Sequence, residues 1–246
     1  MGVEGSAGFH TTQWSLIAAL PGGSGDREAA RAAEALEHLC GAYWRPLYAF
    51  ARRSGKSSED AEDLTQAFLA RLIETDGLGG ADPDRGRFRS YLLGAMKHFM
   101  SAARQRSEAQ KRGGGRRFLA VDIGEIESLL ASSEARGTPA DAELAFDRVW
   151  ARETTAAALR ALEAEWSERG RAEQFAVLRP VLSGDGPART GLAAELGMTE
   201  NAAGVAIHRV RQRYAALVRE AVARTVSDEA DIESEVRYLV DVLREN

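Results

Sequence analysis

Near the C-terminal end of the chain, a cluster of hydrogen-bond donors has the chemistry needed to bind nucleic acid. His208, Arg209, Arg211 and Arg213 lie close together in the sequence. Their side chains can donate to phosphate oxygens, which sets affinity, and to acceptor atoms on base edges, which sets specificity. The elements that precede them decide whether these donors form a binding surface.

The residues before this cluster predict two helices joined by a tight turn. Leu192 and Leu196 belong to a first short helix, and Gly197 suits the turn because a positive φ is easiest without a Cβ. Thr199 can cap the second helix by accepting a hydrogen bond from a backbone N–H two or three residues later. The buried side of the second helix is expected to comprise Val205, Ile207, Val210, Tyr214 and Leu217.

This order is typical of a helix-turn-helix, whose second helix enters the major groove of DNA. The residues expected to bind DNA here are Thr199, Asn201, His208, Arg209, Arg211 and Arg213. The alternative is a tight helical hairpin with a basic face that is merely solvated.

A second basic region lies earlier in the chain. Between Arg85 and Arg117 there are ten basic residues and one acid, Glu108. A helix is expected here from Arg87 to about Arg112, with Phe88 and Tyr91 among its aromatics, and such a helix can hold a separated DNA strand by charge and stacking. Taken alone, the pattern fits better a solvated charged face with the aromatics in the core.

An acidic cluster opens the helix before it. Glu59, Asp60, Glu62 and Asp63 follow Ser57, which can cap the helix. Acidic residues favour helix N-termini because of the helix dipole. The same cluster could dock a basic partner.

Composition narrows the class of protein. The 246 residues are rich in Ala, Leu, Glu and Arg, which predicts an all-α fold. Cys40 is the only cysteine, and there is neither an apolar run of membrane-spanning length nor a signal peptide, so we expect a cytoplasmic protein. No zinc spacing, phosphate-binding loop or nucleophile motif is present, so no metal site, cofactor or enzymatic activity is expected.

The expected organisation is two helical domains with an acidic linker and an acidic C-terminal helix. The domains cover residues 9–118 and 141–225, the linker 119–140 with a short helix near 126–130, and the last helix 226–246. The helices are expected at about 11–20, 26–54, 57–76, 87–112, 141–169, 171–182, 189–196, 200–224 and 228–245.

Taken together, these features resemble the extracytoplasmic-function sigma factors of bacterial RNA polymerase. The segment from Asp60 to Phe68 is similar to that family's polymerase-clamp-binding segment. The segment from Phe88 to Phe99 resembles its strand-opening segment at the minus-ten element, and Leu192 to Arg213 its minus-thirty-five-reading helix-turn-helix.

The resemblance implies core RNA polymerase and promoter DNA as partners. On it, the residues that contact the polymerase clamp are Asp60, Glu62, Asp63 and Gln66. The residues that hold DNA near the start site are Arg87, Arg89, Lys97, Arg104 and Arg106. The chain differs from the family's common pattern at His98 and Ala102, where Asn and Asp are usual, and at Gly204 and Ala206, where basic residues are frequent.

Two hypotheses concern regulation. Thr65 lies in the clamp-binding segment, where phosphorylation by a Ser/Thr kinase would add roughly −1.5 to −2 charge facing a basic clamp. The acidic C-terminal helix carries apolar residues, so it either folds over a DNA-binding surface and inhibits it or packs as an accessory helix. These residues are Ile232, Val236, Leu239, Val240 and Leu243.

The main alternative is a helix-turn-helix transcriptional regulator that acts without polymerase, as a dimer on paired half-sites. It leaves the acidic cluster and the first basic region unexplained. An enzyme or a helical interaction module are further alternatives, and salt-sensitive DNA binding would argue against the latter.

Overall fold

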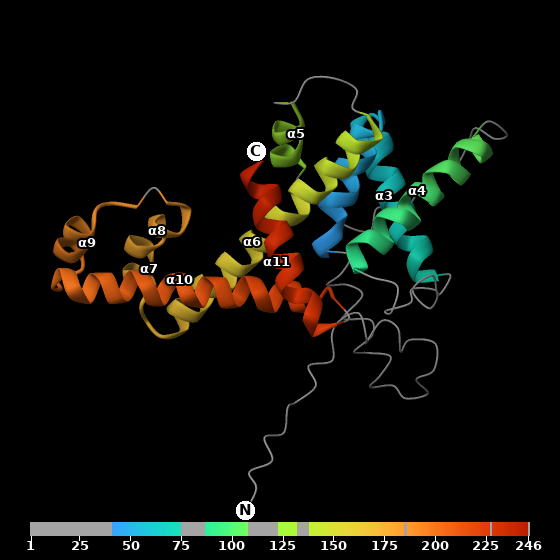
Figure 1. The fold of residues 1–246 in the computed structure, drawn as a ribbon. Coiled ribbons are helices and arrows are strands. Elements are labelled where there is room, and N and C mark those ends of the chain that lie inside the picture. Colours follow the sequence, from blue (N-terminus) through green and yellow to red (C-terminus); the bar gives the residue numbers. More distant parts are fainter. Residues whose placement is uncertain are drawn as a thin grey trace, which may run out of the picture. The chain divides into compact units, whose positions relative to one another are not determined.

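A computed structural model describes residues 41–74, 87–107, 123–131, 138–184, 186–226 and 228–245. Every regular element in these ranges is a helix, as the composition predicts (Figure 1). Residues 41–53 are helical. The helices that follow are α3 (Ser58–Glu74), α4 (Phe88–Ser107), α5 (Gly124–Ala131), α6 (Pro139–Glu168), α7 (Ala172–Leu178), α8 (Pro180–Ser183), α9 (Arg189–Glu195), α10 (Glu200–Ala223) and α11 (Glu229–Arg244).

The chain forms two compact units whose limits differ from the expected domain boundaries. Unit 1 comprises residues up to Ala151 together with Ala223 to the C-terminus, and unit 2 comprises Arg152 to Val222. The start of α6 and the whole of α11 therefore belong to unit 1. The expected helix at 11–20, the first part of that at 26–54 and much of the expected linker lie outside the described residues.

Aromatic side chains from distant parts of the sequence form the core of unit 1. The ring of Tyr43 meets Phe88 of α4 edge to face at 5.3 Å and stacks near Phe146 of α6 at 6.4 Å. Phe68 of α3 lies 5.6 Å from Phe99. Aromatic pairs in such geometries are favourable beyond the area they bury. They join the helix of residues 41–53, α3, α4 and α6 into one core.

Helix α5 belongs to unit 1 and contacts the helix of residues 41–53. Its Ile126 is buried, and the carboxylate of Glu127 accepts hydrogen bonds from Arg52 (Nε–Oε1 2.6 Å, Nη2–Oε2 2.7 Å) and from the hydroxyl of Tyr48. Short and bidentate contacts of this kind are stronger than neutral hydrogen bonds. The short helix expected within the acidic stretch is therefore part of a folded unit.

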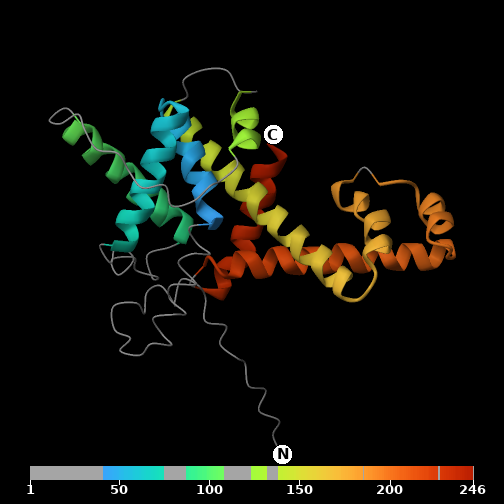
Figure 2. The same cartoon turned by 180° about the vertical axis from the view of Figure 1, so that it is seen from behind.

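Helix α11 lies beside the first half of α6 (Figures 1 and 2). Asp228 caps its first turn by accepting a hydrogen bond from Ala230 N at 2.9 Å. Leu239 and Val242 are buried, and Arg148 of α6 donates to the carbonyl oxygen of Glu245 at 3.0 Å. An amphipathic helix gains most of its stability from such tertiary packing. The acidic C-terminal segment is thus an integral helix of unit 1.

The hydrophobic core of unit 2 is built from both of its long helices and the short helices between them. Leu162 of α6, Phe175 of α7, Leu192 of α9 and Val210 of α10 are all at most 2% exposed. Trp166 packs its ring 5.8 Å from that of Phe175. This core holds α9 and α10 in place. No described helix is long and apolar enough to cross a membrane.

Candidate nucleic-acid interface

The turn between α9 and α10 has the geometry that the sequence predicts. Gly197 adopts φ +62°, a left-handed conformation that side chains with a Cβ rarely adopt. Met198 N donates to Ala193 O at 2.9 Å and closes the turn. The hydroxyl of Thr199 accepts from Ala202 N at 3.3 Å, which confirms its expected role as the cap of α10.

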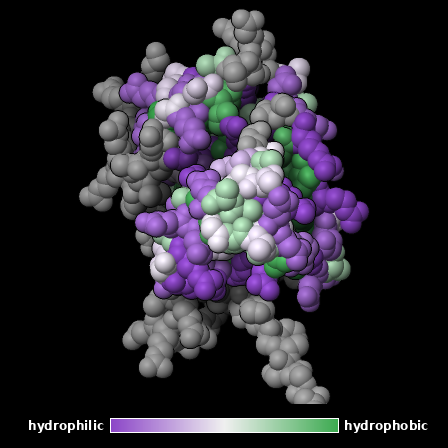
Figure 3. Space-filling model, turned by 90° about the vertical axis from the view of Figure 1, so that its left-hand side faces the viewer, coloured by the Kyte–Doolittle hydropathy of each residue, from purple (hydrophilic) through white to green (hydrophobic). Residues whose placement is uncertain are grey.

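Helix α10 turns one side to the core and the other to solvent. Ala203 and Val210 are buried, whereas Asn201, His208 and Arg209 are exposed. These exposed side chains lie within the first three turns of α10, in the half of a recognition helix that meets base edges. Figure 3 views the α9 end of unit 2, where hydrophilic side chains border a paler surface.

Val205 does not belong to the buried side, and the expectation that it does is wrong. It is 45% exposed. Successive helix residues are rotated by about 100°, so a residue two positions after the buried Ala203 points almost away from the core. Val205 therefore shares the outward side with Asn201 and His208, and it offers an apolar group of the kind that contacts a thymine methyl.

Two of the basic residues on α10 are held by contacts inside unit 2. Arg213 pairs with Glu165 (Nη2–Oε1 2.5 Å) and Glu220 (Nη1–Oε1 2.8 Å), and the hydrogen bonds to Glu165 raise its pKa. Arg211 donates to Val181 O at 3.0 Å. For His208 and Arg209, the described residues provide no such contact. The outward basic groups of this helix are therefore fewer than the sequence suggests.

On α3, the acidic cluster lies at the helix start. Ser57 caps the helix by accepting a hydrogen bond from Asp60 N at 3.0 Å. Asp60 and Asp63 are exposed, while Glu62 and Gln66 are half-buried and 3.4 Å apart between Nε2 of Gln66 and Oε1 of Glu62. The exposed carboxylates can stabilise the helix dipole and still contact a basic partner.

Thr65 lies on the inner side of the same helix. Its side chain is fully buried, and its hydroxyl donates to Ala61 O at 2.7 Å. A kinase would have to unpack α3 to reach this oxygen, and the added charge would then have to be buried. Phosphorylation at Thr65 does not fit the folded unit.

The basic residues of α4, and Arg87 just before it, do not form one continuous face. Arg89 is 9% exposed, and Arg87 donates to Ser234 at 3.0 Å and pairs with Glu235 at 2.9 Å. Lys97 and Arg104 are exposed, Lys97 with its ammonium 2.6 Å from Glu143. The side chain of Arg106 lies outside the described residues.

Arg89 is the centre of a buried network that the sequence analysis did not predict. Its guanidinium contacts the carboxylates of Glu235 and Asp147 (Nη1–Oδ1 2.8 Å to Asp147), and it lies 4.2 Å from the ring centroid of Tyr238 and 5.2 Å from that of Trp150. Tyr238 donates to Asp147 at 2.6 Å. Burial and this bond raise the pKa of Tyr238 to about 12, and burial raises that of Asp147. Arg89 thus acts as a core residue of unit 1, since its donors and both aromatic contacts are internal.

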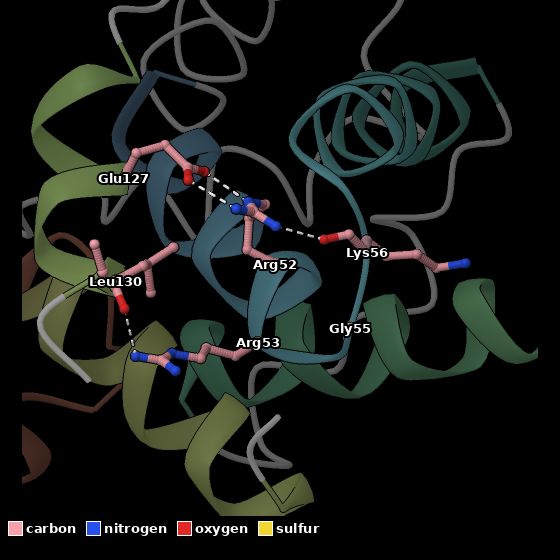
Figure 4. Close-up of a pocket in the computed structure, with 7 residues that line it drawn as sticks. Arg52, Arg53, Gly55, Lys56, Glu127 and Leu130 are labelled. Atoms are coloured by element: carbon pink, nitrogen blue, oxygen red, sulfur yellow. Dashed lines mark hydrogen bonds and ion pairs between the residues drawn. The ribbon is translucent and has the colours of Figure 1, made fainter. Parts of the chain in front are cut away.

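A pocket of about 350 Å³ lies where α5 meets the helix of residues 41–53 (Figure 4). Both guanidinium groups that line it already have partners within the fold. Arg52 donates to Glu127 and to the carbonyl oxygen of Lys56 (2.6 Å), and Arg53 donates to the carbonyl oxygen of Leu130 (2.9 Å). The Lys56 ammonium points away from these groups (Figure 4). The pocket is therefore a space between packed helices whose guanidinium groups are already bound.

Comparison with known families bears on unit 1. Residues 39–109 match the family model described as Sigma-70 region 2. The matched range contains the helix of residues 41–53, α3 and α4, and it is less than a third of the 246 residues. Neither curated proteins nor solved structures give a match to the chain. The match agrees with the resemblance at the level of sigma-70 factors and supports a sigma-factor role, in RNA polymerase binding and promoter recognition.

Proposed function

We propose that the chain is a sigma factor of the extracytoplasmic-function type, which binds core RNA polymerase through unit 1 and promoter DNA through both units. The observation that carries the proposal is the combination of the region 2 match over residues 39–109 with a capped helix-turn-helix at residues 189–222 in a separate unit. A promoter with two separated elements requires two recognition surfaces, and this chain offers one in each unit.

The acidic start of α3 is the polymerase contact in this proposal. Asp60 and Asp63 are exposed, and Glu62 and Gln66 lie beside them on the same helix. Carboxylates in such a position attract a basic helix from a partner and speed association through complementary charge. The role of the cluster rests on the likeness of this segment to the family's clamp-binding segment.

In this proposal, contacts to DNA come from exposed side chains in both units. In unit 1 the exposed basic groups of α4 are Lys97 and Arg104, with Arg106 following on the same helix. In unit 2 the exposed polar side chains of α10 are the amide of Asn201 and the basic groups of His208 and Arg209. Arg87 and Arg89 have internal partners, so we assign them to the fold of unit 1. Thr199 uses its hydroxyl as a cap, and Arg211 and Arg213 orient α10 through their bonds within unit 2.

Gel filtration with core RNA polymerase at moderate salt tests the proposal. The purified chain is expected to co-elute with polymerase, and Asp60→Asn/Asp63→Asn is expected to weaken binding at least tenfold, which corresponds to about 1.4 kcal/mol. A matched control is Glu229→Gln/Asp241→Asn, which removes two exposed charges from α11 of the same unit. Equal loss in both variants would show a general charge effect and would contradict a specific contact through α3.

The polymerase-independent regulator remains the alternative function. The geometry of the helix-turn-helix serves it equally well. It predicts a dimer that binds duplex DNA without polymerase, so absence of co-elution together with tight, salt-sensitive binding to duplex alone would favour it.

A further inference from the structure

Gly204 is an unexpected residue in the exposed first half of α10. A glycine inside a helix costs about 1 kcal/mol relative to alanine, so helix stability does not explain it. A Cβ built at this position would lie 3.4 Å from both Cζ and Nε of Arg189. The guanidinium of Arg189, at the start of α9, therefore lies directly over the backbone of α10 at Gly204. A methyl group would just touch it, and any longer side chain would need the same space.

This places Arg189 beside the outward residues of the recognition helix. Gly204 is three residues after Asn201 and four before His208, and residues at these spacings are neighbours on a helix surface. Asn201, His208 and Arg189 are all exposed. The guanidinium thus adds a basic group to the surface that carries the exposed side chains of α10.

Arg189 shares with Arg209, and not with Arg211 and Arg213, the lack of a contact that holds its side chain within the described part of unit 2. Arg213 is bound by two carboxylates and Arg211 by a carbonyl oxygen. Among the described residues, Arg189 has no carboxylate or carbonyl partner. Its donors remain available in a position that packing against Gly204 defines.

We propose that Arg189 is a DNA-binding residue of the helix-turn-helix, which supplies from α9 the cation that α10 lacks at Gly204. Its planar guanidinium takes a pair of acceptor atoms on duplex DNA, either phosphate oxygens or O6 and N7 of a guanine. The proposal rests on the DNA-binding role of unit 2 proposed above. It explains why the position over which the guanidinium lies carries no long side chain.

The test uses the full chain, alone and with core polymerase, and measures affinity for duplexes selected by the wild type from a random-sequence pool. Arg189→Ala is expected to weaken binding roughly tenfold. Gly204→Ala is expected to bind within about twofold of the wild type, because a methyl group still leaves room for the guanidinium. Arg160→Ala, which removes an exposed charge from α6 in the same unit, is the charge control.

The double variant Arg189→Ala/Gly204→Arg returns a guanidinium to the same surface and is expected to recover most of the lost affinity. If Arg189→Ala loses the same affinity on all sequences, and its affinity depends less steeply on salt concentration, the acceptor is phosphate. If the variant loses the preference for one base pair, the acceptor is guanine. Circular dichroism checks that each variant is folded.

Three results would overturn the proposal. One is an affinity of Arg189→Ala equal to that of the wild type, and another is an equal loss in Arg160→Ala. The third is a double variant as weak as Arg189→Ala, which would contradict the placement over Gly204. A wild type that selects no duplex, alone or with polymerase, would instead remove the proposed function of unit 2 itself.

Discussion

Arg89 and Glu235 stand 146 positions apart in the sequence and form an ion pair inside unit 1, where the side chain of Glu235 is only 1% exposed. The pair connects α4, within the region 2 match, to α11 at the C-terminal end of the chain. The segment that matches sigma-70 region 2 is therefore one part of a unit that a later helix completes.

Breaking this pair should destabilise unit 1. Glu235→Ala leaves the Arg89 guanidinium buried with Asp147 as its one remaining carboxylate, and the expected loss is about 3 kcal/mol of unfolding free energy, the low end for a broken buried pair. Urea unfolding followed by circular dichroism measures it. Glu229→Ala, at an exposed site on the same helix, should change stability by no more than about 0.5 kcal/mol. A Glu235→Ala variant as stable as this control would show that the network contributes nothing.

Removal of α11 decides between the two hypotheses for the C-terminal helix. Truncation after Val226 exposes the partners of Leu239 and Val242 and leaves Arg89 without Glu235. We expect a lower melting temperature and faster hydrogen exchange in α4 and the first half of α6. A truncated chain that melts like the wild type but binds DNA more tightly would instead establish an inhibitory helix.

The docking of α5 should depend on pH through Glu127. Its hydrogen bonds from Arg52 lower the pKa of Glu127, so the carboxylate is held ionised in the folded unit. The ionised Glu127 carboxylate contributes fully to the stability of the folded unit at a pH above the unfolded-state pKa of a glutamate, about 4.3. This contribution is lost as the pH falls through the lower pKa that Glu127 has in the folded unit. Protease sensitivity of residues 124–131 should therefore rise on acidification below about pH 4.

Glu127→Gln is the matched variant for this experiment, because it keeps the shape and removes the charge. It should make the segment sensitive to protease already at neutral pH and abolish most of the acid dependence. A wild type whose protease sensitivity is constant down to pH 3 would contradict the role of Glu127.

The turn of the helix-turn-helix can be tested with one substitution at two glycines. Gly197→Ala forces a Cβ into φ +62° and should cost about 1–2 kcal/mol. Gly191→Ala, within α9, meets only Pro187 Cβ at 3.8 Å and should instead stabilise unit 2 by up to about 1 kcal/mol. Thermal melts of the two variants should therefore shift in opposite directions, and equal shifts would show that the turn does not depend on its glycine.

Local features of this protein follow from the sequence alone. The all-α class, the Gly197 turn and the Thr199 cap depend on residues within a few positions of one another. The sequence therefore suffices to predict them. The resemblance in residues 60–99 likewise depends on a contiguous segment, and the match to residues 39–109 covers it. Helix periodicity correctly places most apolar residues. It wrongly places Val205 on the buried side, because an apolar residue type does not by itself show on which side of a helix the residue lies.

Only the tertiary structure decided which charged groups face solvent. In the sequence, Arg87 and Arg89 resemble the basic residues that follow them in α4, yet both pair with Glu235, far along the chain, and Arg89 is a core residue. In the same way, Arg189 of α9 lies over the backbone of α10 because the two helices pack together and Gly204 leaves room. Such pairings depend on how helices that are far apart in the sequence pack together. The residue pattern of one helix does not show which other helix will cover it.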